Sequence, residues 1–318
     1  MTTAEILAEF SKLKVLVVGD VCLDRWCRYD PALALASRET GIPRVAVVST
    51  EVTPGAAGTI ANNLAALGAG RIAVLGMVGD DGFGYELRRA LAGRGISGDL
   101  LVEAPGIPTF TYTKLINRDT DEEDRPRVDF VYTQDLPPAI DTELVARFRR
   151  VAADHDVILV SDQAETECGG VVTPHMRAAV CEVARDRLVW VDSRLRPEHF
   201  RNAVVKPNQD EAEAASQRLL GRVDYAEFRR QIHAPALIVT HGGKGALVVT
   251  AVGETWVPTQ SVEHPVDICG AGDSFSAGAA MTLKITGDPV QAAMFGNGVA
   301  AVTIMKKGTG TASPEELV

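Results

Sequence analysis

A glycine-containing turn that leads into a helical pattern, Asp267-Ile-Cys-Gly-Ala-Gly-Asp-Ser-Phe-Ser-Ala-Gly278, has the residue types for phosphate chemistry. Glycine lets backbone amides approach an anion closely, and a helix start points unpaired N–H groups and its positive dipole end at that anion. Asp273 lies in the same turn, where a carboxylate could accept a proton while the amides neutralise charge on a transferred phosphoryl group. By itself the turn is equally read as a helix cap, with glycines that only make a tight bend.

Two further groups of polar residues follow apolar runs that are typical of buried strands. Asp20 and Asp24 come after Lys14 to Gly19, while Asn208 and Glu211 follow a short apolar run. Asp24 taken alone is also explained as a solvated loop carboxylate. Asn208 and Glu211 taken alone are also explained as a helix cap and an exposed helical acid.

The segment that follows Ala236 to Thr240 combines a threonine with a cluster of glycines. Thr240, Gly242 and Gly245 could contact phosphates there, and a hairpin turn between strands explains the same residues. Asn297 lies in the small-residue stretch Gly-Asn-Gly-Val-Ala-Ala, which a helix packed closely on a sheet explains. These four residues are therefore candidates whose local pattern leaves both interpretations open.

Positioning such residues requires a framework, and the chain alternates strand and helix patterns from end to end. Strands are predicted at Lys14 to Gly19, Arg71 to Leu75, Asp156 to Ser161, Leu188 to Asp192, Ala203 to Val205 and Ala236 to Thr240. Helices are predicted near the N-terminus, where Thr2 and Glu5 form a capping box, and over Ala57 to Leu67, Gly82 to Arg94, Gly272 to Lys284 and Pro289 to Lys306. We expect an α/β fold, a doubly wound and mostly parallel sheet with helices on both faces, in one domain over residues 1–318.

Two segments depart from this alternation. Residues of about 25–51 are broken by Pro31, Gly41 and Pro43, and residues 109–133 form two strand patterns joined by an acidic, polar stretch. We predict that the two segments pair into a small β-sheet that covers the site like a lid.

Composition narrows the class of partner. The formal net charge is −10 and no run of Lys and Arg occurs, which argues against nucleic acid or an acidic membrane as the main partner. The five cysteines form no Cys-x-x-Cys pair, so we expect neither disulfides nor a zinc site. The amphipathic, acidic N-terminus does not have the pattern of a secretory signal, and no apolar stretch reaches the roughly 18 residues of a membrane span. These features predict a cytoplasmic enzyme that acts on a small molecule.

The residues of the glycine turn resemble the C-terminal signature of the ribokinase (PfkB-type) carbohydrate kinase family. Further stretches resemble that family in the expected order along nearly the whole chain. They are Val18-Gly-Asp-Val-Cys-Leu-Asp24, Pro54-Gly-Ala-Ala-Gly-Thr-Ile-Ala-Asn-Asn63, Lys206-Pro-Asn-Gln-Asp-Glu211 and Thr240-His-Gly-Gly-Lys-Gly245. The resemblance implies a ribokinase-like fold with a β-sheet lid, use of ATP and Mg²⁺, and pairing of the lids of two subunits in a homodimer.

The resemblance also implies roles for single residues. Asp273 would be the general base, and the amides of Gly270, Ala271 and Gly272 would form the anion hole. The sugar would be bound by Asp24 and its neighbours in the matching motifs, namely Asp20, Gly55, Ala56, Thr59 and Asn63. ATP would be bound by Asn208, Glu211, Thr240, Gly242, Gly245 and Asn297, with Glu211 holding Mg²⁺ through water. Asp267 would belong to a site for a monovalent cation.

Within the family, the segment from Phe10 to Asp20 and the tail from Lys307 to Leu317 are most similar to heptose 7-phosphate kinases. If the substrate carries a phosphate, some of six basic residues should converge on it: Arg25, Arg28, Arg38, Arg44, Lys114 and Arg127.

Several positions depart from the family pattern. Ala56 and Thr59 replace a glycine and an asparagine, Gln163 replaces a tyrosine in an acidic loop, and Cys269 replaces a Thr or Ser near the cation site. An ATP-dependent sugar or sugar-phosphate kinase is therefore the first hypothesis. A catalytically weak relative that senses a sugar or a nucleotide is the alternative. A dinucleotide-dependent oxidoreductase is disfavoured because no Gly-x-Gly-x-x-Gly follows the first strand.

Overall fold

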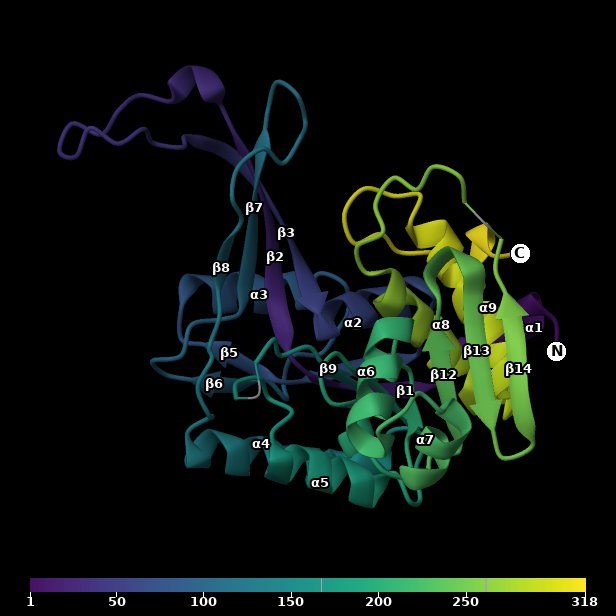
Figure 1. Ribbon diagram of the computed structural model, residues 1–318. Helices are drawn as coiled ribbons and strands as arrows, with labels where there is room; N and C mark the ends of the chain where they lie inside the picture. Colours follow the sequence, from purple (N-terminus) through teal and green to yellow (C-terminus); the bar gives the residue numbers. More distant parts are fainter. Residues whose placement is uncertain (167, 261) are drawn as a thin grey trace.

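An eight-stranded sheet forms the centre of the computed structural model, which describes residues 1–166, 168–260 and 262–318 (Figure 1). Its strand order is β14-β13-β12-β11-β10-β9-β1-β4. The strands are β1 (Lys14–Gly19), β4 (Arg71–Leu75), β9 (Val157–Asp162), β10 (Val189–Ser193), β11 (Val204–Val205), β12 (Ala236–Thr240), β13 (Gly245–Thr250) and β14 (Gly253–Pro258). The six strands from β12 to β4 pair in parallel, whereas β13 and β14 are antiparallel.

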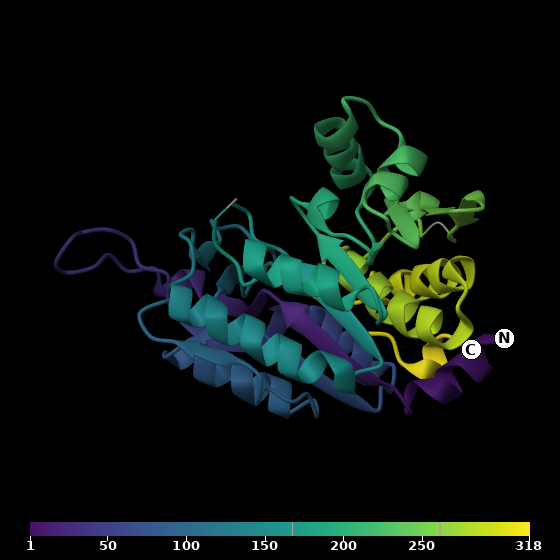
Figure 2. The same ribbon diagram turned by 90° about the horizontal axis from the view of Figure 1, so that it is seen from below.

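Helices cover both faces of this sheet because successive side chains of a strand point to opposite sides. In β1, Val15 and Val17 pack into one hydrophobic cluster, and Leu16 and Val18 pack into the other. The first cluster is completed by α1 (Thr3–Phe10), α2 (Ala57–Ala66), α3 (Gly82–Ala92), α8 (Ala271–Thr286) and α9 (Pro289–Thr303). The second is completed by α4 (Pro138–Val151), α5 (Pro174–Val183), α6 (Gln209–Leu220) and α7 (Tyr225–Gln231). Figure 2 shows α4 and α5, in teal, in front of the strands. The predicted doubly wound sheet is confirmed.

A second sheet of four strands, here called the lid, rises from one side of the body (Figure 1). It contains β2 (Val21–Tyr29), β3 (Val47–Ala56), β7 (Thr111–Asn117) and β8 (Val128–Phe130) in the order β3-β2-β7-β8. The two predicted lid segments do pair with each other, but their limits differ from the prediction. β2 begins at Val21, with only Asp20 between it and β1, and β3 continues through Pro54 and Gly55 to Ala56.

The remaining elements are short. A two-stranded parallel sheet joins β5 (Met77–Gly79) and β6 (Val102–Ala104). Single 3₁₀ turns lie at η1 (Pro31–Leu33), η2 (Ala152–Asp154), η3 (Pro197–His199), η4 (Gly242–Lys244) and η5 (Pro314–Glu316). None of the helices in the described ranges is long and apolar enough to cross a bilayer. That residues 1–318 make up one domain stays a prediction.

The chain order places a ligand crevice at one point of the main sheet. From β1 the chain goes to β4 on one side and later to β9 on the other, so the connections leave in opposite directions. In open α/β sheets, ligands bind at the carboxyl ends of the strands at such a point. Asp20 follows β1 and Gln163 follows β9, so both flank this crevice.

Candidate active site

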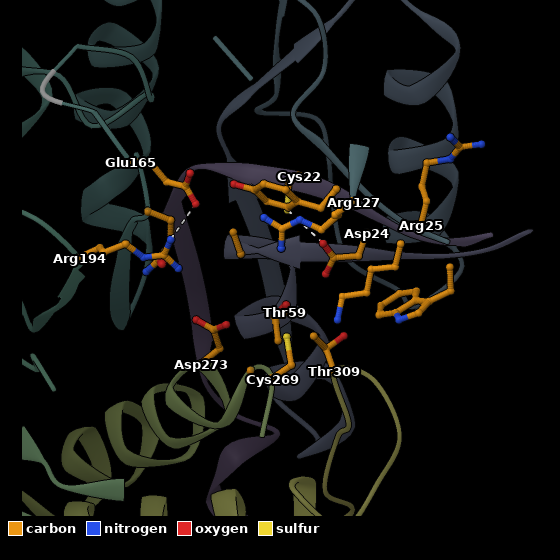
Figure 3. Close-up of a pocket in the computed structure, with 16 residues that line it drawn as sticks. Cys22, Asp24, Arg25, Thr59, Arg127, Glu165, Arg194, Cys269, Asp273 and Thr309 are labelled. Atoms are coloured by element: carbon orange, nitrogen blue, oxygen red, sulfur yellow. Dashed lines mark hydrogen bonds and ion pairs between the residues drawn. The ribbon is translucent and has the colours of Figure 1, made fainter. Parts of the chain in front are cut away.

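A cavity of about 220 Å³ lies between the lid and the body at this crevice (Figure 3). The lid contributes Asp24 and Lys114 to its lining, and Arg127, directly before β8, adds a further cation. The body contributes Thr59 and Asp273, which Figure 3 shows below the lid residues. Residues from distant parts of the sequence therefore face one space, with carboxylates and cations on both sides.

The floor of the cavity is the start of α8. Gly270 precedes the helix with a φ of 77°, a left-handed conformation that favours glycine. The helix begins at Ala271, one residue before the predicted start, and the Ala271 amide donates to the carbonyl of Ile268 at 3.2 Å. The Gly272 amide follows within the first turn, where α-helical amides have no intrahelical acceptor. Of the three amides predicted for the anion hole, the one of Ala271 thus already has an acceptor within the chain.

Asp273 lies in the first turn of α8 and is half-buried at the edge of the cavity. Among the described residues its carboxylate has no hydrogen-bond partner. Burial raises the pKa of Asp273 to about 8, and the nearby negative charge of Asp192 adds to the rise, while Lys206 and Arg194 oppose it. A carboxyl group with a pKa near neutrality is suited to general-base work.

Asp24 faces the same cavity from β2. Burial raises the pKa of Asp24 to about 6, although the positive charges of Lys114 and Arg127 lower it in part. The Cys22 thiol donates a weak hydrogen bond to its Oδ1 at 3.6 Å. A Cβ atom at Gly55 would lie 2.4 Å from Asp24 Oδ2. Gly55 does not line the cavity itself, but because it has no side chain it leaves space for the Asp24 carboxylate.

The other predicted sugar-side residues divide into two groups. Ala56 and Thr59 line the cavity, and Ala56 has a φ of 53°, which is strained for a residue with a Cβ atom. Asn63 is fully buried and donates to the carbonyl of Thr59 at 3.0 Å within α2, so its side chain does not line the cavity.

Asp20 holds the acidic loop that follows β9. Its buried carboxylate accepts the amides of Gln163 at 2.9 Å and Val171 at 2.7 Å. Burial raises the pKa of Asp20 to about 6, and the neighbouring Asp162 adds to this. The structure thus gives Asp20 a role in positioning the loop that carries Glu165.

On the side predicted for ATP, Asn208 and Glu211 form a reciprocal cap of α6. The Glu211 amide donates to Asn208 Oδ1 at 2.9 Å, and the Asn208 amide donates to Glu211 Oε2 at 2.8 Å. Burial raises the pKa of Glu211, and the negative charge of Asp192 raises it further. The helix-cap interpretation of this pair is therefore correct. Glu211 Oε1 has no hydrogen-bond partner among the described residues, so the cap leaves one oxygen for a ligand.

A magnesium ion fits this arrangement only with help from a phosphate. The described residues contain no cluster of three or more His, Cys, Asp or Glu side chains that could hold a metal ion. Mg²⁺ commonly uses one or two carboxylates together with water and substrate phosphates. The free oxygen of Glu211 could supply one such carboxylate contact.

The remaining predicted nucleotide residues lie near the edge strands of the main sheet. The Thr240 amide donates to the carbonyl of Pro207 at 3.0 Å, which brings it beside Asn208. Gly242 and Gly245 both have positive φ, 56° and 114°, in the tight turn between β12 and β13, so the hairpin-turn interpretation is also correct. Asn297 is buried and its amide group donates to the carbonyl of Val257 at 3.3 Å.

Asp267, predicted for a monovalent cation, uses both carboxylate oxygens within the chain. Oδ1 accepts the amide of Cys269 at 2.9 Å, and Oδ2 accepts the amide of Gly308 at 3.2 Å. These bonds join the turn before α8 to the C-terminal segment. The cation site itself stays a prediction.

Sequence reasoning missed a buried ion pair beneath the floor of the cavity. Lys206 Nζ lies 2.9 Å from Asp192 Oδ2, and the Lys206 side chain is only 3% exposed. The Ser276 hydroxyl, from α8, also donates to Asp192 Oδ2, at 3.2 Å. Lysine is rarely buried, so its position directly after the apolar β11 was a signal that could have pointed to this pair.

Comparisons with known proteins agree with this geometry. The model of the pfkB family of carbohydrate kinases matches residues 12–316. The chain belongs to the pfkB family. Membership of this family makes it a carbohydrate kinase. Among curated relatives, the bifunctional protein HldE of Shewanella baltica strain OS195 is 31% identical over 319 residues, which cover 98% of this chain and 64% of that protein.

Solved structures of a ribokinase and a putative ribokinase show the same fold. Ribokinase from Thermotoga maritima aligns with a TM-score of 0.67 at 20% identity and covers 96% of this chain and 98% of its own. A putative ribokinase II from E. coli, solved with ATP and Mg²⁺, aligns with a TM-score of 0.68 at 18% identity and covers 96% and 97%. At these identities the alignments establish the ribokinase-like fold of this pfkB protein.

Proposed function

We propose that this pfkB kinase transfers the γ-phosphate of ATP to a hydroxyl of a sugar or sugar phosphate, with Asp273 as the general base. The observation that carries the proposal is the position of Asp273, at the start of α8 and facing a cavity that Asp24 also lines. Asp24 would hold the sugar hydroxyls. Asp273 would accept the proton of the attacking hydroxyl, whose oxygen bonds to phosphorus as the bond to ADP breaks. The amides of Gly270 to Gly272 would form the anion hole, the one of Gly272 being the most available.

We assign the nucleotide to the other side of Asp273 from the sugar held by Asp24. Asn208 and Glu211 would organise ATP with Mg²⁺, and a water held by the free Glu211 oxygen would contact the ion. Thr240, Gly242 and Gly245 would contact phosphates, and Asn297 would lie near the adenine. The E. coli neighbour solved with ATP and Mg²⁺ supports the use of these two cofactors. Bound Mg²⁺ would supply positive charge to the phosphates, and a monovalent cation near Asp267 is a further part of the proposal.

A phosphorylated sugar of the heptose 7-phosphate type is the favoured acceptor. Three of the six predicted cations, Arg25, Lys114 and Arg127, do line the cavity. The Lys114 ammonium lies 3.7 Å from Glu123, too far for a strong ion pair, so it could turn to a phosphate. The Lys114→Ala variant should raise KM for a phosphorylated sugar far more than KM for its unphosphorylated form.

A screen of ATP consumption over heptoses, hexoses and pentoses, each with and without a phosphate, tests the function. The wild-type protein should turn over at least one sugar phosphate, and the Asp273→Asn variant should not, although it still binds MgATP. Sugar or nucleotide binding without turnover of any sugar would instead support the alternative of a binding sensor.

The lid is proposed to pair two copies of the chain. Exposed apolar side chains concentrate on the lid and its long loop: Leu33, Leu35, Ile42, Val45, Val47, Val48, Val128, Phe130 and Val131. A patch of this kind is typical of an interface. Light scattering should give a dimer that Leu35→Glu with Val48→Glu converts to a monomer. A cytoplasmic location, where ATP is available, completes the proposal.

A further inference from the structure

Arg194 is a cavity residue that the proposed mechanism does not yet use. It directly follows β10, and its amide donates to the carbonyl of Asp162 at 3.0 Å. Asp162 is buried and also accepts the Ser193 hydroxyl at 2.6 Å and the Arg196 guanidinium at 2.5 Å. The backbone on both sides of Arg194 is therefore fixed to the end of β9.

The side chain of Arg194 extends from this fixed backbone into the cavity, where it meets Glu165 (Figure 3). Arg194 Nη1 lies 3.1 Å from Glu165 Oε1. The two side chains are 47% and 54% exposed. An ion pair this exposed adds little free energy, so a better anionic ligand can replace Glu165.

The Arg194 guanidinium lies near both the sugar side and the ATP side of the proposed site. Its charge lowers the pKa of Asp273, on the sugar side, and that of Glu211, on the ATP side. Lys206 acts on the same two carboxyl groups, but it is buried and paired with Asp192. Arg194 is thus an accessible cation within electrostatic reach of both the proposed base and the proposed nucleotide side.

We propose that Arg194 is a catalytic residue that leaves Glu165 and pairs with the phosphoryl group while it moves from ATP to the sugar. This inference rests on the proposed function. A phosphoryl group in transfer carries charge on its equatorial oxygens, and a planar guanidinium can contact two of them at once. Glu165 holds the side chain in a nearby, ordered position when no phosphoryl group is present. The acidic loop is then a partner of the phosphate-binding cation.

The test compares Arg194→Gln, Arg194→Lys and Glu165→Gln in the full chain. Arg149→Gln is the matched control, because Arg149 also forms an exposed pair with a glutamate, Glu182, at 2.9 Å on the helical surface. One readout is the affinity for MgADP with fluoroaluminate, a mimic of the transferring phosphoryl group, in the presence of a heptose 7-phosphate. The others are the affinity for MgADP alone and the separate values of kcat and KM.

Arg194→Gln should weaken the fluoroaluminate complex and lower kcat by about 10²- to 10³-fold each, while MgADP affinity and the sugar KM change by less than about threefold. Arg194→Lys should restore part of the loss. Glu165→Gln should tighten the fluoroaluminate complex by up to about fivefold, because the competing carboxylate is lost. Arg149→Gln should match the wild type throughout.

Two results would overturn the role of Arg194. One is a fluoroaluminate complex of wild-type affinity in Arg194→Gln. The other is a higher sugar KM at unchanged kcat, which would make Arg194 a binder of the substrate's own phosphate. If the wild-type protein forms no fluoroaluminate complex and turns over no sugar, the proposed phosphotransferase function fails, and this inference fails with it.

Discussion

Replacing Asp273 with Asn should remove the activity and at the same time stabilise the fold at high pH. Below pH 3.8 the carboxyl group is protonated in both the folded and the unfolded chain. Between 3.8 and about 8 the folded chain keeps the proton that the unfolded chain has lost, so stability falls as pH rises through this window. Asn cannot ionise, and the variant avoids this loss.

The size of the effect follows from the pKa of Asp273. At about 1.4 kcal/mol for each tenfold change in proton affinity, a pKa raised from 3.8 to about 8 gives an upper limit of about 6 kcal/mol. Because the side chain is only half-buried and the cavity admits solvent, we expect about 1–2 kcal/mol at pH 9. kcat should fall by about 10²- to 10⁴-fold, the usual range for a general base.

Urea unfolding of the wild type and Asp273→Asn at pH 5 and pH 9 measures this difference. The stability advantage of the variant should grow between the two pH values. Asp186→Asn is the control, because Asp186 is an exposed carboxyl group outside the cavity. An advantage that is the same at both pH values, or near-normal turnover by Asp273→Asn, would refute the reasoning.

Three further predictions follow from the same site. Ala56→Gly should stabilise the protein by about 1 kcal/mol, measured by urea unfolding. Relief of the strained φ of 53° at Ala56 should outweigh the extra conformational entropy that glycine gives the unfolded chain. Equal stability of the variant and the wild type would contradict this. Gly55→Ala should raise the sugar KM by roughly ten- to hundredfold with little change in melting temperature, since its Cβ would displace the Asp24 carboxylate; an unchanged KM would argue against sugar binding by Asp24. In pH profiles, kcat/KM should rise through a pKa of about 8 as Asp273 loses its proton, and Asp192→Asn should move this rise to lower pH by removing a nearby negative charge. A profile that does not move would exclude that coupling.

The strands of the main sheet were predictable because they are buried on both faces and read as continuous apolar runs. β1, β4 and β12 have the predicted limits, and β9 and β10 are shifted by one residue. The lid was harder to delimit. β2 mixes apolar and charged residues, and only Asp20 separates it from β1. The predicted lid segment ended at about residue 51, whereas β3 continues through Pro54 to Ala56; β3 is an edge strand, where a proline is tolerated.

The candidate site was predictable where one short segment holds the whole feature. The turn before Asp273 and the cap formed by Asn208 and Glu211 are of this kind. Arg194 and the Lys206–Asp192 pair were not found, because their partners lie far away in the sequence and meet only through the sheet. The Asn63 side chain is buried within α2 and does not line the cavity, which a motif cannot reveal because it does not show which helical positions face the core.

The direct connection of β1 to β2 bears on whether ATP is hydrolysed when no sugar is bound. Asp24 belongs to the lid and Asp273 to the body, and Asp20 is the one residue between the strands that join these two parts. If Asp24 holds the sugar and Asp273 is the base, as proposed, acceptor and base are aligned only when a sugar contacts both the lid and the body. A water molecule is much smaller than this cavity of about 220 Å³ and cannot contact both parts at once, so we expect little hydrolysis of ATP in the absence of a sugar.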